Sequence, residues 1–125
     1  MTRRVVLIAD SRADYFSPMG PLLGALSDAG AMTELFSDGP AGLQSAVRGG
    51  TDLLLIDLDT PSLGGLEALS EISRIAARVP VLLLTGHDSR ARRMWAVGAG
   101  VMGYVTKPVD GPLLVRFISK VLKEA

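Results

Sequence analysis

An unbroken run of aliphatic residues that ends in an acid is the feature that most constrains this chain. The run extends from Leu53 to Ile56, and Asp57 follows it directly. A second acid stands at Asp59, and Pro61 closes the segment. A short aliphatic run bounded by turn-forming residues is typical of a buried strand in a parallel sheet. Asp57 would then lie at the carboxyl end of a central strand, where open α/β sheets bind their ligands. An acid in that position is a candidate nucleophile, a candidate metal ligand, or both.

Glycine, proline and capping residues divide the rest of the chain into alternating strand and helix patterns. The expected strands are 5–9, 32–36, 52–56, a segment within 79–85, and 101–106. The expected helices are 21–30, 41–48, one starting near 65, one from Asp88 or Ser89 to 97 that stops at Gly98, and 112–123 capped by Asp110. Strands that alternate with helices predict a parallel sheet covered on both faces, because right-handed crossovers place the helices there. We therefore expect one domain over residues 1–125 with a flavodoxin-like, doubly wound (βα)5 fold. This fold is a three-layer sandwich whose five-stranded parallel sheet has the order 2-1-3-4-5.

Composition and charge exclude several classes of protein. Apolar residues make up 48% of the chain and charged residues 21%, which is the balance of an ordinary globular protein. Lysine plus arginine equals aspartate plus glutamate at 13 each, so no net charge attracts nucleic acid or an anionic membrane. The chain has no cysteine, which excludes disulfides and thiolate metal sites. The first apolar run covers only residues 5–9, too short for a signal peptide or a membrane span. We expect a cytoplasmic protein.

Polar residues stand at the ends of four predicted strands. Asp10 follows the first strand, Asp57 the third, Thr85 ends the fourth, and Lys107 follows the fifth. The carboxyl ends of parallel strands meet at one edge of the sheet, so these side chains are expected to converge. Carboxylates gathered there repel one another unless a cation is present, and Mg²⁺ prefers oxygen ligands of this kind. Lysine and threonine on the same edge suit an anion, for which phosphoryl is the obvious candidate.

In this order and spacing, the motifs resemble those of response-regulator receiver domains, the chemotaxis-Y-like switches of two-component signalling, over essentially the whole chain. The motifs are Leu7-Ile8-Ala9-Asp10, the Asp57 strand with Pro61 and Gly65, the strand end at Thr85, and Gly103-Tyr104-Val105-Thr106-Lys107-Pro108.

The resemblance implies a phosphorylation switch rather than an enzyme with turnover on a small substrate. It implies that Asp57 accepts a phosphoryl group from a phosphohistidine on a sensor histidine kinase or a phosphotransfer protein. Thr85 and Lys107 would then bind phosphoryl oxygens. The implied Mg²⁺ ligands are Asp10, Asp57 and the backbone carbonyl of Asp59.

The resemblance also implies how the switch signals. The switching residues would be Thr85, Tyr104 and Pro108, and the Lys107–Pro108 peptide bond is often cis in such domains. Their movement would remodel the face made by the fourth helix, the fifth strand and the fifth helix. A downstream protein, a fused effector domain or a second copy of the chain would bind that face.

The acid pair expected after the first strand is incomplete. Receivers usually carry two adjacent acids there, and this chain has Asp10-Ser11. A neutral hydroxyl is a poor substitute for a carboxylate on Mg²⁺. If the register slips by one residue, Asp10 is the direct ligand and Ala9 replaces the other acid. Asp59 or Asp14 could restore the missing charge. We expect weakened rather than abolished metal binding.

Two other functions fit parts of the pattern. A pseudo-receiver would keep the fold as an interaction module that does not depend on phosphorylation, and Ser11 favours this alternative. Asp57-Leu58-Asp59-Thr60 also resembles the opening motif of haloacid-dehalogenase-type phosphatases. That family usually has this motif on its first strand, whereas here two strand–helix units precede it. Its closing acid pair is also missing after Lys107, where only Asp110 follows.

Overall fold

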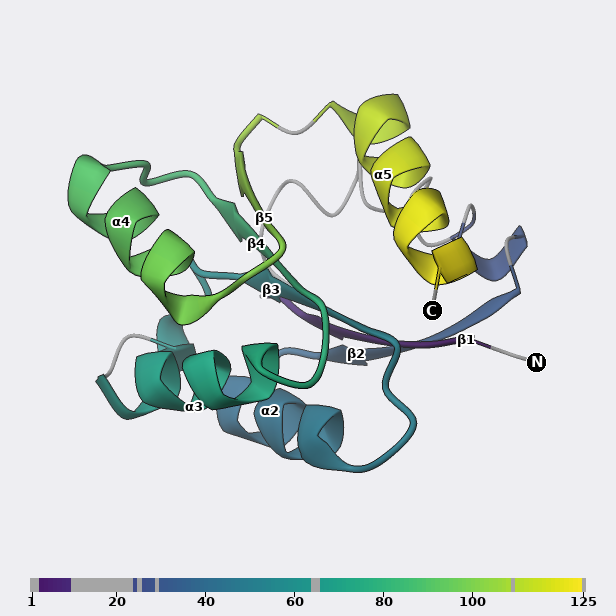
Figure 1. Ribbon diagram of the computed structural model, residues 1–125, viewed down its shortest axis with the longest axis horizontal. Helices are drawn as coiled ribbons and strands as arrows, with labels where there is room; N and C mark the ends of the chain where they lie inside the picture. The colour runs from purple at the N-terminus through teal and green to yellow at the C-terminus, as the bar shows by residue number, and fades with distance from the viewer. Residues whose placement is uncertain are drawn as a thin grey trace.

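The computed structural model describes residues 3–9, 24, 26–28, 30–63, 66–108 and 110–124. Within this part of the chain, five parallel strands form one sheet in the order β2-β1-β3-β4-β5 (Figure 1). The strands are β1 Arg3–Ile8, β2 Ala31–Phe36, β3 Leu53–Asp57, β4 Val81–Thr85 and β5 Gly103–Thr106. The predicted strand order and the flavodoxin-like fold are confirmed.

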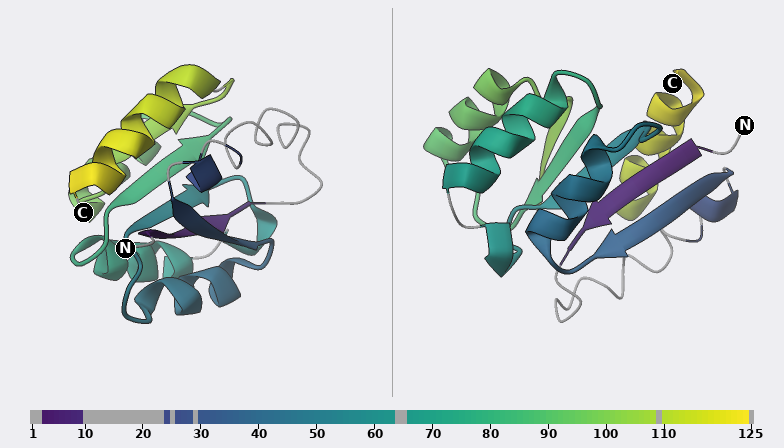
Figure 2. Two further views of the ribbon diagram at one scale, coloured as in Figure 1. Left: turned by 90° about the vertical axis from the view of Figure 1, so that its right-hand side faces the viewer. Right: turned by 90° about the horizontal axis from the view of Figure 1, so that it is seen from below.

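Helices cover both faces of the sheet (Figures 1 and 2). Their bounds are α2 Gly39–Val47, α3 Leu66–Ala76, α4 Arg90–Ala99 and α5 Gly111–Glu124, and a 3-10 turn, η1, covers Pro61–Leu63. Residues 24 and 26–28 are helical, and the rest of the helix expected at 21–30 lies outside the described residues. None of the described helices has the length and apolar character needed to cross a membrane.

The alternation of side chains along each strand builds two hydrophobic cores. In β1, Val5 and Leu7 face the core that contains Leu26 and α5, whereas Val6 and Ile8 face the core formed with α2, α3 and α4. The same alternation holds in β3 and β4, and every residue of these two strands is buried. Because both faces are covered, these strands consist of continuous apolar runs rather than alternating ones.

Helix α4 differs from the prediction at its carboxyl end. The helix continues through Gly98 to Ala99, and Gly100 ends it with a left-handed backbone at φ 79°. Glycine adopts this conformation without steric cost, which suits it to the position after a helix. At the amino end, Ser89 is the cap, and its hydroxyl accepts a hydrogen bond of 3.0 Å from the backbone N–H of Arg92.

Candidate functional site

Asp57 is the last residue of β3, and its side chain is only 1% exposed. Its Oδ1 accepts hydrogen bonds from the backbone N–H of Asp59 at 2.9 Å and from Lys107 Nζ at 3.0 Å. A buried carboxylate is tolerated only when hydrogen bonds and opposite charge compensate for lost hydration. The lysine that follows β5 supplies such a charge, as the convergence of strand ends predicts.

Backbone hydrogen bonds hold the segment that follows Asp57. The N–H of Leu58 donates to the carbonyl of Leu84 at 2.8 Å, which extends the pairing of β3 with β4. The N–H of Thr60 donates to the carbonyl of Asp57 at 3.1 Å, which makes a tight turn. The Thr60 side chain is buried there, and its hydroxyl has no hydrogen-bond partner in the structure as described. After this turn the Asp59 carboxylate contacts Thr85 at the end of β4 and Lys107 after β5.

Thr85 ends β4 and is fully buried. Its carbonyl accepts a hydrogen bond of 2.8 Å from the N–H of Lys107, which ties the ends of β4 and β5 together. Its hydroxyl donates to Asp59 Oδ1 at 3.2 Å and accepts from Arg92 Nη1 at 2.7 Å and from the His87 N–H at 3.0 Å. The Thr85 hydroxyl thus lies beside the Asp59 carboxylate, and the ends of β4 and β5 meet at one edge of the sheet, as predicted.

The carboxylate of Asp59 lies among hydrogen-bond donors. Its Oδ1 accepts from the Thr85 hydroxyl at 3.2 Å, and its Oδ2 accepts from the Gly86 N–H at 2.7 Å and from Lys107 Nζ at 2.9 Å. Oδ1 lies 3.0 Å from His87 Nδ1. Burial by itself raises the pKa of Asp59, but the hydrogen bonds from His87, Gly86 and Lys107 and the lysine charge outweigh it. The pKa of Asp59 is therefore held well below its usual range, and the side chain is a carboxylate at neutral pH.

The remaining predicted site residues are Tyr104, Pro108, Asp10 and Ser11. The Tyr104 hydroxyl donates to Asp88 Oδ1 at 3.1 Å, and burial together with this bond to an acid raises the pKa of the phenol. The Lys107–Pro108 peptide bond is cis, which confirms that expectation. Asp10 and Ser11 lie outside the described residues. Among the residues that are described, no three acidic or histidine side chains are grouped so as to hold a metal ion.

Arg92 and Gly86 also belong to the site, although the sequence pattern did not predict them there. Arg92 reaches from the first turn of α4 to the Thr85 hydroxyl and lies 3.6 Å from Asp59 Oδ1. A Cβ on Gly86 would lie 3.1 Å from Asp59 Oδ2, so glycine permits the close approach of its N–H to that carboxylate. A glycine directly after a strand-end threonine was an available signal. For Arg92, the sequence offered only one arginine among several near the start of a helix.

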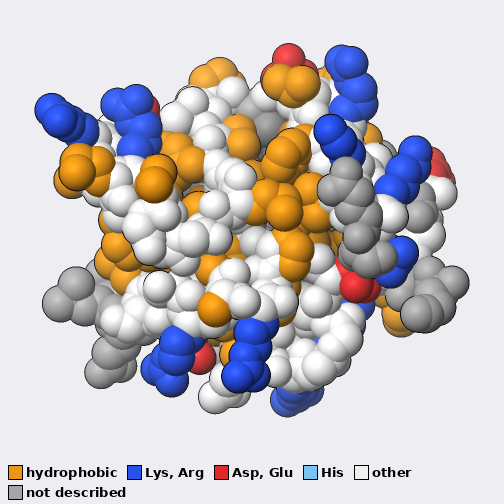
Figure 3. All heavy atoms as spheres, in the orientation of Figure 1, with side chains coloured by type: hydrophobic (Ala, Val, Ile, Leu, Met, Phe, Trp, Pro, Cys, Tyr) orange, Lys and Arg blue, Asp and Glu red, His pale blue; other side chains and the backbone are white. Residues whose placement is uncertain are grey.

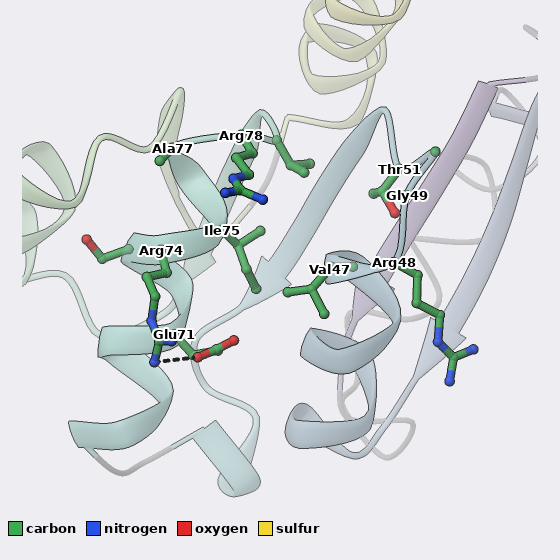
Figure 4. Close-up of a pocket in the computed structure, with 13 residues that line it drawn as sticks. Val47, Arg48, Gly49, Thr51, Glu71, Arg74, Ile75, Ala77 and Arg78 are labelled. Atoms are coloured by element: carbon green, nitrogen blue, oxygen red, sulfur yellow. Dashed lines mark ion pairs between the residues drawn. The ribbon is translucent and has the colours of Figure 1, made fainter.

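A large hollow lined by described residues lies at the opposite edge of the sheet. It is an open groove of about 790 Å³ between the carboxyl ends of α2 and α3 (Figure 4). Val47 and Ile75 point toward one another across it, and Arg74 forms an ion pair of 3.1 Å with Glu71 (Figure 4). Arg48 points away from the groove (Figure 4). The groove contacts none of the strand-end residues, so its size does not make it the candidate site.

A second, smaller hollow lies beside the edge strand β5. It has a volume of about 350 Å³ and is lined mainly by residues of β5 and α5, together with Leu82, Met102 and Asp110. Met102, Leu113 and Phe117 are large hydrophobic residues exposed there, and Met94 and Val97 are exposed on α4. Figure 3 shows hydrophobic side chains gathered between α4 and α5. These five residues are called the α4–β5–α5 patch below.

Comparison with known proteins agrees with this geometry. Residues 6–119 match the response regulator receiver domain family. The chain is 33% identical over 110 residues to sensory transduction protein RegX3 of Mycobacterium tuberculosis, which covers 88% of this chain and 48% of RegX3. It is 27% identical over 121 residues to protein PilH of Pseudomonas aeruginosa, which covers 95% of this chain and 97% of PilH.

A solved structure gives the same result. The receiver domain of sensor histidine kinase PA1611 from Pseudomonas aeruginosa PAO1, which has a magnesium ion coordinated in its active-site cleft, is 26% identical with a TM-score of 0.74. The match covers 98% of this chain and 99% of that one. The chain spans about half the length of RegX3. The fold and the strand-end residues agree with the family match over residues 6–119. The chain therefore belongs to the response regulator receiver domain family of two-component signalling.

Proposed function

We propose that Asp57 accepts a phosphoryl group from a phosphohistidine on a sensor histidine kinase or a phosphotransfer protein. The observation that carries this proposal is the buried Asp57 carboxylate with Lys107 Nζ 3.0 Å from Oδ1. A carboxylate oxygen attacks phosphorus, the P–N bond breaks, and the imidazole nitrogen keeps the electron pair. The product is an acyl phosphate on Asp57. Lys107 and the Thr85 hydroxyl offer charge and a hydrogen bond to the phosphoryl oxygens.

The donor set at this edge fits a hard divalent cation. Asp57 brings a buried carboxylate to it, and Mg²⁺ binds to oxygen atoms of this kind in proteins. Receiver domains typically bind Mg²⁺. In this chain Asp57, the backbone carbonyl of Asp59 and Asp10 would hold the ion. When bound, Mg²⁺ supplies positive charge that offsets the acids and the phosphoryl oxygens. Ser11 in place of a second acid weakens the site.

The proposed chemistry takes place only on Asp57 of the chain itself, whose phosphoryl group comes from the donor protein. Receiver domains are signalling domains rather than classical enzymes. The Asp57 pocket catalyses its own phosphorylation and the slow attack of water on the acyl phosphate, which releases phosphate and regenerates the carboxylate. No turnover on a small substrate is part of the proposal.

The α4–β5–α5 patch is the proposed output surface. Its exposed Met94, Val97, Met102, Leu113 and Phe117 suit an apolar partner surface. Tyr104 lies on β5, which pairs with β4 where Thr85 ends it, and the Tyr104 hydroxyl donates to Asp88 before α4. We propose that a shift of Thr85 reaches the patch through these paired strands. The partner is a downstream protein, a fused effector domain or a second copy of the chain.

The balance of charged residues and the receiver-domain family guide what we propose about the domain, its location and its partners. We take residues 1–125 as a single receiver domain that works in the cytoplasm. Equal numbers of basic and acidic residues, 13 each, argue against direct binding to nucleic acid or to an anionic membrane. The proposed function does not depend on whether further domains belong to the same protein.

One observation favours a second candidate, the phosphorylation-independent interaction module. In the unphosphorylated chain, the Asp59 carboxylate already binds Thr85 and Lys107. With Ser11 in place of an acid, a chain of this kind could retain the fold and its partner surface without accepting phosphoryl.

Intact-mass analysis after incubation with acetyl phosphate tests the proposed function. The chain, Asp57→Asn and the exposed control Asp28→Asn are each incubated with and without Mg²⁺. We expect a Mg²⁺-dependent gain of one phosphoryl group in the chain and in Asp28→Asn, and none in Asp57→Asn. No adduct on the folded chain at high Mg²⁺ would instead support the phosphorylation-independent module.

A further inference from the structure

The donors that would receive a phosphoryl group are already bound to an anion of the chain itself. The two oxygens of the Asp59 carboxylate contact a hydroxyl, a backbone N–H, an imidazole and an ammonium group. The donors are Thr85 Oγ1, Gly86 N, His87 Nδ1 and Lys107 Nζ, at 3.2, 2.7, 3.0 and 2.9 Å. Arg92 Nη1 adds positive charge 3.6 Å away. A phosphoryl group attached to Asp57 would accept hydrogen bonds from donors of the same kind.

The Thr85 hydroxyl cannot donate to the Asp59 carboxylate and to a second anion at the same time. A hydroxyl has one hydrogen to donate and can accept at two lone pairs. Here the hydrogen goes to Asp59 Oδ1, and the oxygen accepts from Arg92 Nη1 at 2.7 Å and from the His87 N–H at 3.0 Å. The hydrogen bond from Thr85 to Asp59 therefore has to break before the hydroxyl can donate to a phosphoryl oxygen.

Lys107 is engaged in the same way. Its ammonium group bridges Asp57 Oδ1 and Asp59 Oδ2 at 3.0 and 2.9 Å. A phosphoryl group on Asp57 would bring a charge of about −1.5 to −2 close to the Asp59 carboxylate. Two anions that share one lysine and one hydroxyl repel each other, so the carboxylate and the phosphoryl group compete for these donors.

We propose that the Asp59 side chain is an internal occupant of the phosphoryl-oxygen site and competes with the phosphoryl group for Thr85, Gly86 and Lys107. This inference rests on the proposed function and adds a residue that sets how readily the site accepts an anion. The apparent affinity for a phosphoryl-like anion is lowered by the fraction of molecules in which Asp59 fills the site. Removal of the carboxylate should therefore increase that affinity.

Fluoroberyllate, which binds a carboxylate without covalent transfer from a donor, is the probe. With Mg²⁺ present, it is titrated into the chain, Asp59→Asn, Asp59→Ala and the matched control Asp28→Asn, and the Gly86 amide is followed by NMR. We expect both Asp59 variants to bind at least about tenfold more tightly, which is about 1.4 kcal/mol. Asp28→Asn loses the same charge from an exposed site and should bind like the unmodified chain.

The ligand-free spectra provide a readout that requires neither metal nor anion. The hydrogen bond of 2.7 Å to a carboxylate should move the Gly86 amide proton downfield in the unmodified chain. In Asp59→Ala that proton should return upfield, while the dispersion of the remaining spectrum shows that the variant is folded. A Gly86 proton that does not move in Asp59→Ala would overturn the inference.

The remaining outcomes separate this inference from the proposed function. Equal or weaker fluoroberyllate binding in the Asp59 variants overturns the inference, and weaker binding would mean that the carboxylate assists the metal. Absence of binding in every variant also overturns it, because removal of the occupant then exposes no anion site. If the Asp59 variants bind more tightly but Asp57 never gains a phosphoryl group from acetyl phosphate, the proposed function fails and the internal occupant is supported.

Discussion

Replacement of Lys107 by methionine removes the ammonium group that joins the two carboxylates of the site. Nζ lies 3.0 Å from Asp57 Oδ1 and 2.9 Å from Asp59 Oδ2, and methionine retains much of the apolar stem. Loss of one partner from a fully buried ion pair costs about 3–5 kcal/mol, and loss of an exposed pair costs about 0–1 kcal/mol. The Asp57 side chain is 1% exposed, but the side chains of Lys107 and Asp59 are 17% and 18% exposed. We therefore expect the free energy of unfolding to fall by about 2–3 kcal/mol, between the two limits.

Urea unfolding at neutral pH measures this loss, and Lys120→Met is the matched control. Lys120 is exposed on α5, so its replacement should change the free energy of unfolding by less than about 0.5 kcal/mol. Addition of Asp59→Asn to Lys107→Met should recover part of the loss, because only one of the two carboxylates then remains without the lysine charge. If Lys107→Met is as stable as Lys120→Met, the bridging geometry does not contribute to stability and the reasoning is refuted.

Further predictions concern packing, capping and pH. Gly42→Ala should cost about 1–3 kcal/mol in urea unfolding, because its Cβ would lie 2.7 Å from Ile8 Cδ1; an unchanged midpoint would contradict the packing described. Ser89→Ala should cost about 1 kcal/mol through loss of the α4 cap, and Ser89→Asp should retain most of it. Thr60→Val should be neutral or stabilising by up to about 1 kcal/mol, because the buried hydroxyl has no partner among the described residues; a marked loss would reveal one. The pKa of Asp59 is lowered in the folded chain, so its contribution to stability is present above the unfolded value of about 3.9 and is lost as pH falls below it. Urea midpoints measured at decreasing pH should therefore fall less steeply in Asp59→Asn, and parallel curves would refute the assignment.

The sheet was predictable because its signals are local and repeated. Each buried strand is a continuous aliphatic run, and glycine, proline or a capping residue separates it from the next helix pattern. Element ends were less predictable. Gly98 and Gly100 are both plausible stops for α4, and only the left-handed backbone at Gly100 shows which one ends the helix. A glycine inside a helix costs about 1 kcal/mol, which the packing of the neighbouring Ala96 and Ala99 can offset.

The site was predictable as far as it depends on topology. Asp57, Thr85 and Lys107 converge because parallel strands end at one edge, whatever the rotamers of these residues. The positions of the Asp59 carboxylate and of Arg92 depend instead on a tight turn after β3 and on a long side chain that extends back from α4. Sequence spacing does not determine rotamers across three elements, so these contacts were not foreseen.

The position of the Asp59 carboxylate also bears on the missing acid at Ser11. The sequence left open that Asp59 restores the lost negative charge at the metal site. Its two oxygens are instead hydrogen-bonded to Thr85, Gly86 and Lys107, and a carboxylate cannot direct the same lone pairs at these donors and at a metal ion. The two roles of Asp59 therefore exclude each other within one conformation. A Mg²⁺ titration of Asp59→Asn distinguishes them: unchanged or tighter Mg²⁺ binding is expected if the carboxylate serves the donors, whereas a loss of affinity would show that it serves the metal.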